Sequence, residues 1–236
     1  MNSAPDWSTN YRHPTAWDQP FAPLSLPDML AASTARMGDA PMLDFMGRRF
    51  SYAEVAGAVA RVARGLQQLG IGKGSRVGLF LPNVPQYVAA YYGALAAGAT
   101  VVNFSPLYTA RELEAQVEDS GTDTLVTLSA TALLPTALTV LDGSSLKRLV
   151  VGSIAGGLPT AKSLLYRLFK KSEVTALPDD PRVIRFSALI ANDGRPDLAE
   201  GERTGVDWPD HCMRLLPADE TALAEPEAKE IAEVAP

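Results

Sequence analysis

The stretch "NFSPLYTARELEAQVEDSG", Asn103 to Gly121, joins a short apolar run to an amphipathic segment. Within it, Thr109 is followed three residues later by Glu112, the spacing of a capping box that marks the first turn of a helix. Gly121 is the residue type that most readily takes the left-handed conformation at a helix end. The stretch therefore predicts a buried strand, a tight turn and a helix that ends at Gly121.

The same alternation of strand and helix extends to both sides of this stretch. Ser51 and Glu54 form a second capping box, and "VGLFL" (77–81), "TVVNF" (100–104), "TLVTL" (124–128) and "KRLVVGSI" (147–154) are short apolar runs between amphipathic segments. Such strands are typical of a parallel sheet that helices cover on both faces. With right-handed crossovers, the sequence predicts a doubly wound, mostly parallel α/β fold.

The chain divides into three regions by composition. Residues 1–25 are polar and punctuated by proline, which favours an extended arm, and residues 26–195 hold the predicted α/β domain. Residues 196–236 form a loop and an Ala/Pro-rich tail that we expect to be disordered, because it lacks the apolar residues of a core. The end of this tail carries one base, Lys229, and six acids: Asp219, Glu220, Glu225, Glu227, Glu230 and Glu233.

Composition argues against several classes of function. The formal net charge of −6 disfavours nucleic acid as a partner, since binding to a duplex requires a positive field. The single cysteine, Cys212, allows no disulfide within the chain, which suits a reducing cytoplasm. The two histidines, His13 and His211, lack the spacing of metal ligands. We therefore expect a cytoplasmic chain with no metal site of its own.

Two segments near residue 160 invite a functional interpretation. "GGLPTAKS" (156–163) follows an apolar run and misses the phosphate-loop pattern by one residue, because Ala161 stands where the second glycine belongs. The basic amphipathic segment after it fits either a core-covering helix, which is the plainer interpretation, or a helix lying on an anionic membrane. The candidate membrane-contact residues are Lys162, Leu164, Leu165, Arg167, Leu168, Phe169, Lys170 and Lys171.

Several segments in order resemble the early part of AMP-forming acyl-CoA synthetases. They are "SYAEV", "GIGKGSRVGLFLPN", "YYGALAAGATVVN", "SPLYTARELEAQVEDSG" and "GLPTAKSLLYRLFKK", and the resemblance covers about Leu26 to Asn192. It is strongest to the long-chain fatty acid–CoA ligase branch of the adenylate-forming superfamily. The resemblance implies an N-terminal portion built from α/β subdomains. For the full-length family it implies an acyl-adenylate formed from an acid and ATP with Mg²⁺, and then a thioester formed with CoA.

The chain departs from this family after "VDWPD" (206–210). A Ser/Thr/Gly-rich phosphate loop ending in Pro-Lys-Gly is expected soon after that point, but the sequence reads "HCMRLLPADETALAEPEAKEIAEVAP". The resemblance therefore assigns no catalytic, cofactor-binding or metal residue to this chain. We expect an N-terminal fragment, inactive alone, that arises from a frameshift or gene break near Asp210. The alternative is a non-catalytic module that docks on the membrane or pairs with a separately encoded catalytic half.

Overall fold

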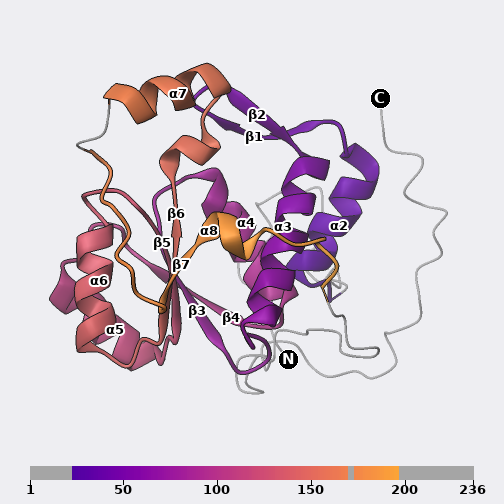
Figure 1. The fold of residues 1–236 in the computed structure, drawn as a ribbon. Coiled ribbons are helices and arrows are strands. Elements are labelled where there is room, and N and C mark those ends of the chain that lie inside the picture. The colour runs from indigo at the N-terminus through magenta and orange to yellow at the C-terminus, as the bar shows by residue number, and fades with distance from the viewer. Residues whose placement is uncertain (1–22, 170–172, 197–236) are drawn as a thin grey trace, which may run out of the picture. The chain divides into compact units, whose positions relative to one another are not determined.

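A five-stranded parallel sheet forms the centre of the computed structural model, which describes residues 23–169 and 173–196 (Figure 1). The strand order is β4-β3-β5-β6-β7. The strands are β3 Arg76–Phe80, β4 Thr100–Phe104, β5 Thr124–Leu128, β6 Arg148–Gly152 and β7 Val183–Arg185. The helices are α2 Leu26–Met37, α3 Tyr52–Gln68, α4 Pro85–Ala96, α5 Ala110–Ser120, α6 Leu134–Gly143, η1 Ile154–Gly157, α7 Thr160–Phe169 and α8 Phe186–Leu189. The predicted doubly wound α/β fold is confirmed.

An antiparallel hairpin, β1 Pro41–Phe45 and β2 Arg48–Ser51, precedes the sheet in the chain. Its turn passes through Met46 and Gly47, which have positive φ angles of 52° and 90°, respectively. Lys170 and Lys171 lie outside the described residues. Almost all of the predicted arm (1–25) and of the predicted tail (196–236) also lies outside them. The predicted boundaries of these regions therefore stay predictions.

Both predicted capping boxes are present. The Thr109 backbone N–H donates to Glu112 Oε2 at 2.9 Å, and the Glu112 N–H donates to Thr109 Oγ1 at 3.4 Å. The equivalent pair at the start of α3 joins Ser51 and Glu54, with the Ser51 N–H donating to Glu54 Oε2 at 2.8 Å. Gly121 has the left-handed conformation predicted for the end of α5. These local polar contacts satisfy amides that the helix itself leaves unpaired.

One predicted helix begins later than expected. Helical composition from Ala130 to Leu141 predicts a helix there, but α6 runs from Leu134 to Gly143. The preceding residues pair instead with a distant segment, because Ala130 forms an antiparallel bridge with Val174 and the Thr131 N–H donates to the Glu173 carbonyl at 3.1 Å. A contact across more than forty intervening positions leaves no periodic signal in the local sequence.

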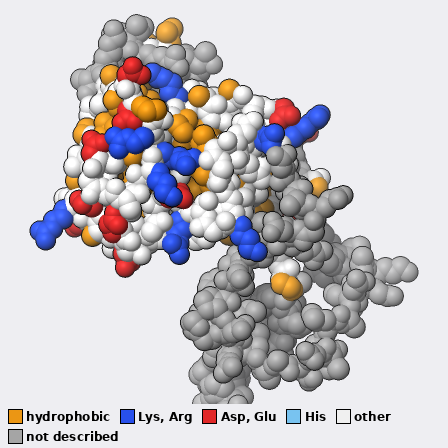
Figure 2. Space-filling model, turned by 60° about the horizontal axis from the view of Figure 1, so that its bottom comes forward, with side chains coloured by type: hydrophobic (Ala, Val, Ile, Leu, Met, Phe, Trp, Pro, Cys, Tyr) orange, Lys and Arg blue, Asp and Glu red, His pale blue; other side chains and the backbone are white. Residues whose placement is uncertain are grey.

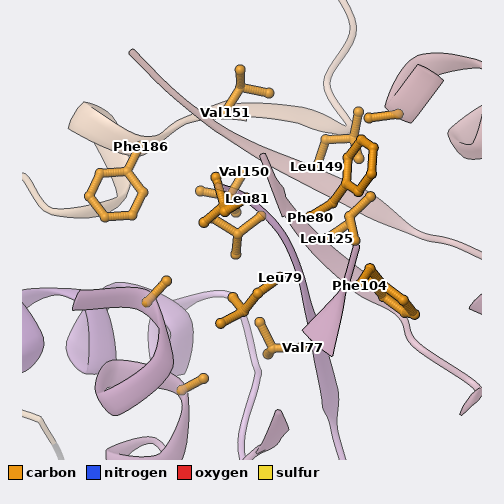
Figure 3. Close-up of a cluster of buried hydrophobic side chains, with 14 of the residues drawn as sticks. Val77, Leu79, Phe80, Leu81, Phe104, Leu125, Leu149, Val150, Val151 and Phe186 are labelled. Atoms are coloured by element: carbon orange, nitrogen blue, oxygen red, sulfur yellow. The ribbon is translucent and has the colours of Figure 1, made fainter. Parts of the chain in front are cut away.

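The core lies on both faces of the sheet (Figure 3). Val77, Leu79 and Leu81 point to one side, whereas Phe80 and Phe104 point to the other. In Figure 1, α5 and α6 cover one face, and α3, α4 and α8 cover the opposite face. The continuous apolar runs of β3, β5 and β6 thus correspond to strands that are buried on both sides, whereas β4 at the sheet edge is partly exposed.

Glycines allow two close contacts within the helix layer. A Cβ at Gly93 of α4 would lie 2.5 Å from Val62 Cγ1 of α3, so a larger residue would push these helices apart. A Cβ at Gly65 of α3 would collide with the Leu189 backbone of α8. The chain immediately after β7 therefore packs directly on α3, which places α8 beside the carboxyl ends of the strands.

Candidate functional site

The sheet has a switch in direction at its centre. From β3 the chain adds β4 on one side, and then returns to add β5 on the other side of β3. In open α/β sheets, ligands bind outside the carboxyl ends of the strands at such a point. The connection that leaves β3 runs toward β4, whereas the connection that leaves β5 runs toward β6 on the other side. A binding site is therefore expected at this edge, between β3 and β5.

A pocket of about 660 Å³ lies at this edge. Its residues come from the hairpin, from α3 and α4, from the connections after β5 and β6, and from α8. Its walls are mainly apolar, and they include Leu43, Phe50, Val55, Pro85, Ala89, Val151, Val174, Leu177, Phe186 and Ile190. This volume is within the range of small-molecule sites in proteins. No sequence pattern predicts the pocket, because its residues come from separate elements along the chain.

Gln86 is the polar side chain that distinguishes this pocket. It stands in the first turn of α4, lines the pocket and is only 8% exposed. Its Nε2 donates to the Ser153 carbonyl at 2.8 Å. This bond fixes the orientation of the amide, since the amide oxygen could not donate to a carbonyl. Gln86 Oε1 is buried and has no hydrogen-bond partner in the structure.

Three other polar residues of the pocket, Glu54, Ser129 and Arg185, differ from Gln86 in their contacts. Glu54 also lines the pocket, but its carboxylate already accepts the Ser51 N–H of the capping box. Ser129 is built into the backbone network, because its N–H donates to the Gly152 carbonyl and its own carbonyl accepts from Thr175. Arg185 lines the pocket as an exposed residue. Gln86 Oε1 is unpaired among the described residues, but it is buried and has no surface open to the pocket.

The phosphate-loop near miss has a different geometry from a phosphate cradle. Residues 154–157 form the 3₁₀ helix η1, in which the Gly156 N–H donates to the Ser153 carbonyl at 3.1 Å. The Leu158 N–H is also used, by the Ala155 carbonyl at 3.4 Å. Lys162 Nζ donates to the Met46 carbonyl at 2.7 Å, so the lysine is committed to the hairpin. Two amides of the near miss, those of Gly156 and Leu158, and its lysine are therefore already occupied.

Six of the eight candidate membrane-contact residues fall on α7, and Lys170 and Lys171 lie outside the described residues. Leu164 and Leu165 are 61% and 53% exposed, and Lys162 is also exposed. The hairpin turn held by Lys162 adds another exposed apolar side chain, Met46, at 59%. The backbone of Arg167, Leu168 and Phe169 continues the helix, and nothing is described of their side chains.

The surface shows charge of both signs in the view of Figure 2, in which the bottom of Figure 1 comes forward. Lys and Arg side chains occur there together with Asp and Glu around a central apolar area. Within residues 23–169 and 173–196, no group of three or more His, Cys, Asp or Glu side chains is placed to hold a metal ion. No helix in that same part of the chain has the length and apolar character to cross a bilayer.

Comparison with known sequences places the chain in a family. The profile described as "AMP-binding enzyme" matches residues 30–188. The chain is 34% identical over 174 residues to a long-chain-fatty-acid–CoA ligase of Bacillus subtilis (strain 168), and this match covers 74% of the chain and 31% of that protein. A ligase of the same name from Escherichia coli O157:H7 is 36% identical over 181 residues, covering 75% of the chain and 32% of the relative. The chain thus spans about a third of the length of these relatives.

Known structures agree on the fold. The crystal structure of coronafacic acid ligase from Pectobacterium brasiliense matches with a TM-score of 0.57 at 15% sequence identity. This match covers 73% of the chain and 30% of that ligase. At such low identity, the likeness concerns the fold alone. The sequence matches and this fold together show that the chain belongs to the AMP-binding enzyme family and corresponds to the N-terminal portion of an adenylate-forming enzyme.

Proposed function

We propose that these 236 residues are the N-terminal scaffold of a long-chain fatty acid–CoA ligase and do not activate an acid by themselves. One observation carries the proposal: the residues that match the ligases amount to about a third of their length. Within the 236 residues, no Ser/Thr/Gly-rich loop followed by Pro-Lys-Gly occurs. Transfer of an adenylate requires groups that hold the phosphates against the attacking carboxylate.

The contacts of the phosphate-loop near miss support this proposal. The amides of Gly156 and Leu158 are used within η1, and Lys162 binds the hairpin. The full-length enzyme would use ATP, Mg²⁺ and CoA, and the residues that hold them would come from the remaining two thirds of such a ligase. This chain would supply the sheet against which that remainder packs.

Pyrophosphate release tests the proposal. The purified 236-residue chain is incubated with ATP, Mg²⁺, CoA and palmitate, and the full-length Bacillus subtilis relative is assayed in parallel to show that the assay works. We expect no release above the protein-free blank. Turnover by the chain alone would refute the proposal. A melting scan with and without ATP adds a binding readout, in which we expect an unchanged melting temperature.

We propose peripheral contact with an anionic membrane as a second role. Leu164, Leu165 and Met46 are exposed together on α7 and the hairpin turn that Lys162 fastens to it. Exposed leucines on a helix that also carries Lys162 and Arg167 suit the boundary between lipid headgroups and acyl chains. Anionic headgroups would add an attraction that falls with salt. This contact would place the chain on the cytoplasmic face of the membrane.

Co-sedimentation with vesicles tests the second role. Wild type, Leu164→Ser/Leu165→Ser and Leu107→Ser are compared on phosphatidylcholine vesicles with and without phosphatidylglycerol. Leu107 is a matched control because it is 89% exposed and lies outside α7, in the connection between β4 and α5. We expect the double variant to bind much less than the wild type, and Leu107→Ser to bind equally well. Equal binding by all three proteins would dismiss α7 as the contact.

A further inference from the structure

The two edge strands of the sheet differ in how well they are protected against pairing with another strand. β7, at one edge, is only three residues long and ends in a charged residue, Arg185. β4, at the other edge, is five residues long, contains no proline or charged residue, and pairs with β3 in unbroken register (Figure 1). Shortness, charge, proline and bulges are the devices by which proteins block a sheet edge. β4 has none of them, and no strand of the described residues pairs with its outer side.

One hydrogen bond fixes the direction of the backbone groups along β4. The Thr100 N–H donates to the Ser75 carbonyl at 2.9 Å, so the backbone groups of Thr100 face β3. Successive residues of a strand direct these groups to opposite sides, and those of Val102 therefore also face β3. The N–H and C=O groups of Val101 and Asn103 point away from the sheet. None of the loop and turn hydrogen bonds of the described residues uses these outward groups.

We propose that β4 pairs antiparallel with β4 of a second copy of this chain, about a two-fold axis that passes beside Val102. In this register, Val101 lies opposite Asn103 of the second copy, and such a pair exchanges both of its N–H···O=C bonds. Every outward N–H group of Val101 and Asn103 then has a partner on both copies. Val102 faces its own copy across the axis, where opposite side chains come closest, and β-branched pairs stabilise that position.

The absence of charge and the closure of the assembly favour a second copy as the occupant. An axis perpendicular to the sheet brings α4, which connects β3 to β4, beside its own copy. The sequence of α4 contains no charged residue, and its partly exposed Tyr87 and Tyr91 have stacked rings 6.2 Å apart. Pairing therefore brings no like charges together on this side of the sheet. Because β7 is short and charged, the assembly closes at two copies.

Analytical ultracentrifugation of the 236-residue chain tests this pairing. We expect the wild type to be a dimer that dissociates on dilution. Asn103→Pro removes one outward N–H from each copy but no bond between β4 and β3, and proline is tolerated on sheet edges. It should weaken dimerisation at least about tenfold, the effect of losing these hydrogen bonds. Asn103→Ala is the matched control, because it removes the side chain and its 2.9 Å bond from the Tyr87 hydroxyl but keeps the N–H. It should dimerise like the wild type.

Disulfide cross-linking tests the register independently. Val102→Cys and Val101→Cys are each prepared with Cys212→Ser, which removes the single native cysteine. On mild oxidation, Val102→Cys should form a disulfide between two copies, because residues opposite each other at this position have Cα atoms about 4.5 Å apart, within disulfide range. Val101→Cys should form little, because in the proposed register its two copies are offset along the strands beyond the reach of a disulfide. Non-reducing electrophoresis measures both.

Three results would overturn the proposal. A wild type that stays monomeric at all concentrations would leave the β4 edge to residues 1–22 of its own chain or to the remainder of a ligase. Undiminished dimerisation of a folded Asn103→Pro variant would place the interface elsewhere. Equal cross-linking of the two cysteine variants would exclude the register, and this test remains decisive if Asn103→Pro does not fold. None of these results depends on pyrophosphate release, so this proposal and the proposed function fail separately.

Discussion

The two strand–helix joints that leave β3 and β4 satisfy their backbone groups in opposite ways. After β4, the exposed pair Thr109 and Glu112 exchange hydrogen bonds and complete the first turn of α5 from within the joint. After β3, Val84 precedes α4 without any side-chain cap, and Pro85 removes one of the donors that a cap would serve. The polar residue that follows, Gln86, reaches across to Ser153 instead and leaves its oxygen unpaired.

The difference separates polar groups that pair within their own joint from one that stays unpaired. In the β4–α5 joint, the polar groups form hydrogen bonds with one another and need no other partner. A joint that buries a polar group without a partner has a cost that folding alone does not explain. The β3–α4 joint is of this second kind, and it lies beside the pocket at the switch point.

The largest effect should come from the packing beneath the capped joint. Leu113, which is fully buried on α5, anchors that helix to the sheet. Leu113→Ala should lower the free energy of unfolding by about 2–5 kcal/mol, because it leaves a cavity. The matched substitution Leu107→Ala, at an 89% exposed site in the same joint, should change it by less than about 0.5 kcal/mol. Urea unfolding measures both, and similar values would mean that the cap rather than the core holds α5.

Helix packing behind the uncapped joint should give the next largest effect. Gly93→Ala places a Cβ against Val62 and should destabilise the protein by about 1–3 kcal/mol. Gly57 is the matched control, since a Cβ there would meet only the end of Arg61, at 3.8 Å. Gly57→Ala should stabilise by up to about 1 kcal/mol, the preference of a helix for alanine. Melting temperatures that shift in the same direction would contradict the close contact of α3 and α4.

The two joints themselves are compared by removing their polar groups. Thr109→Ala should cost about 1 kcal/mol in the free energy of unfolding, the usual effect of losing an N-cap. Gln86→Met should cost less than Thr109→Ala, because it removes the unpaired Oε1 along with the bond from Nε2, and the Ser153 carbonyl still accepts from the Gly156 N–H. If Gln86→Met were the more damaging of the two, Gln86 would be a structural residue and the contrast between the joints would disappear.

The sequence predicts the first joint well and the second poorly, for physical reasons. A capping box spans only three residues, so the local sequence predicts the roles of Thr109 and Glu112. The left-handed conformation of Gly121 is equally local and is also predicted. The bridge between Ala130 and Val174, which delays α6, and the bond between Gln86 and Ser153 join positions far apart in the chain. For the second joint, the local sequence offers one signal, a glutamine at the start of the otherwise apolar helix α4. Its meaning depends on the strand order, which the sequence pattern leaves open.

The smallest effect is a pH dependence confined to the capped joint. Hydrogen bonds from Thr109 to the carboxylate hold the pKa of Glu112 below its ordinary value of 4.5. A carboxyl group with a lowered pKa in the folded state stabilises that state above its ordinary pKa, and this contribution is lost as pH falls through the folded pKa. Glu112→Gln keeps an acceptor for the Thr109 N–H but does not titrate.

The difference between the wild type and Glu112→Gln therefore isolates this single group. Hydrogen bonds from Arg182 also lower the pKa of Asp180, but that carboxyl titrates in both proteins and cancels in the comparison. We expect the wild type to lose its advantage in unfolding free energy as the pH falls below about 4.5, the ordinary value for glutamate. Parallel curves across that range would show that the Glu112 carboxylate contributes no charge-dependent stability, and that the cap acts through its neutral hydrogen bonds alone.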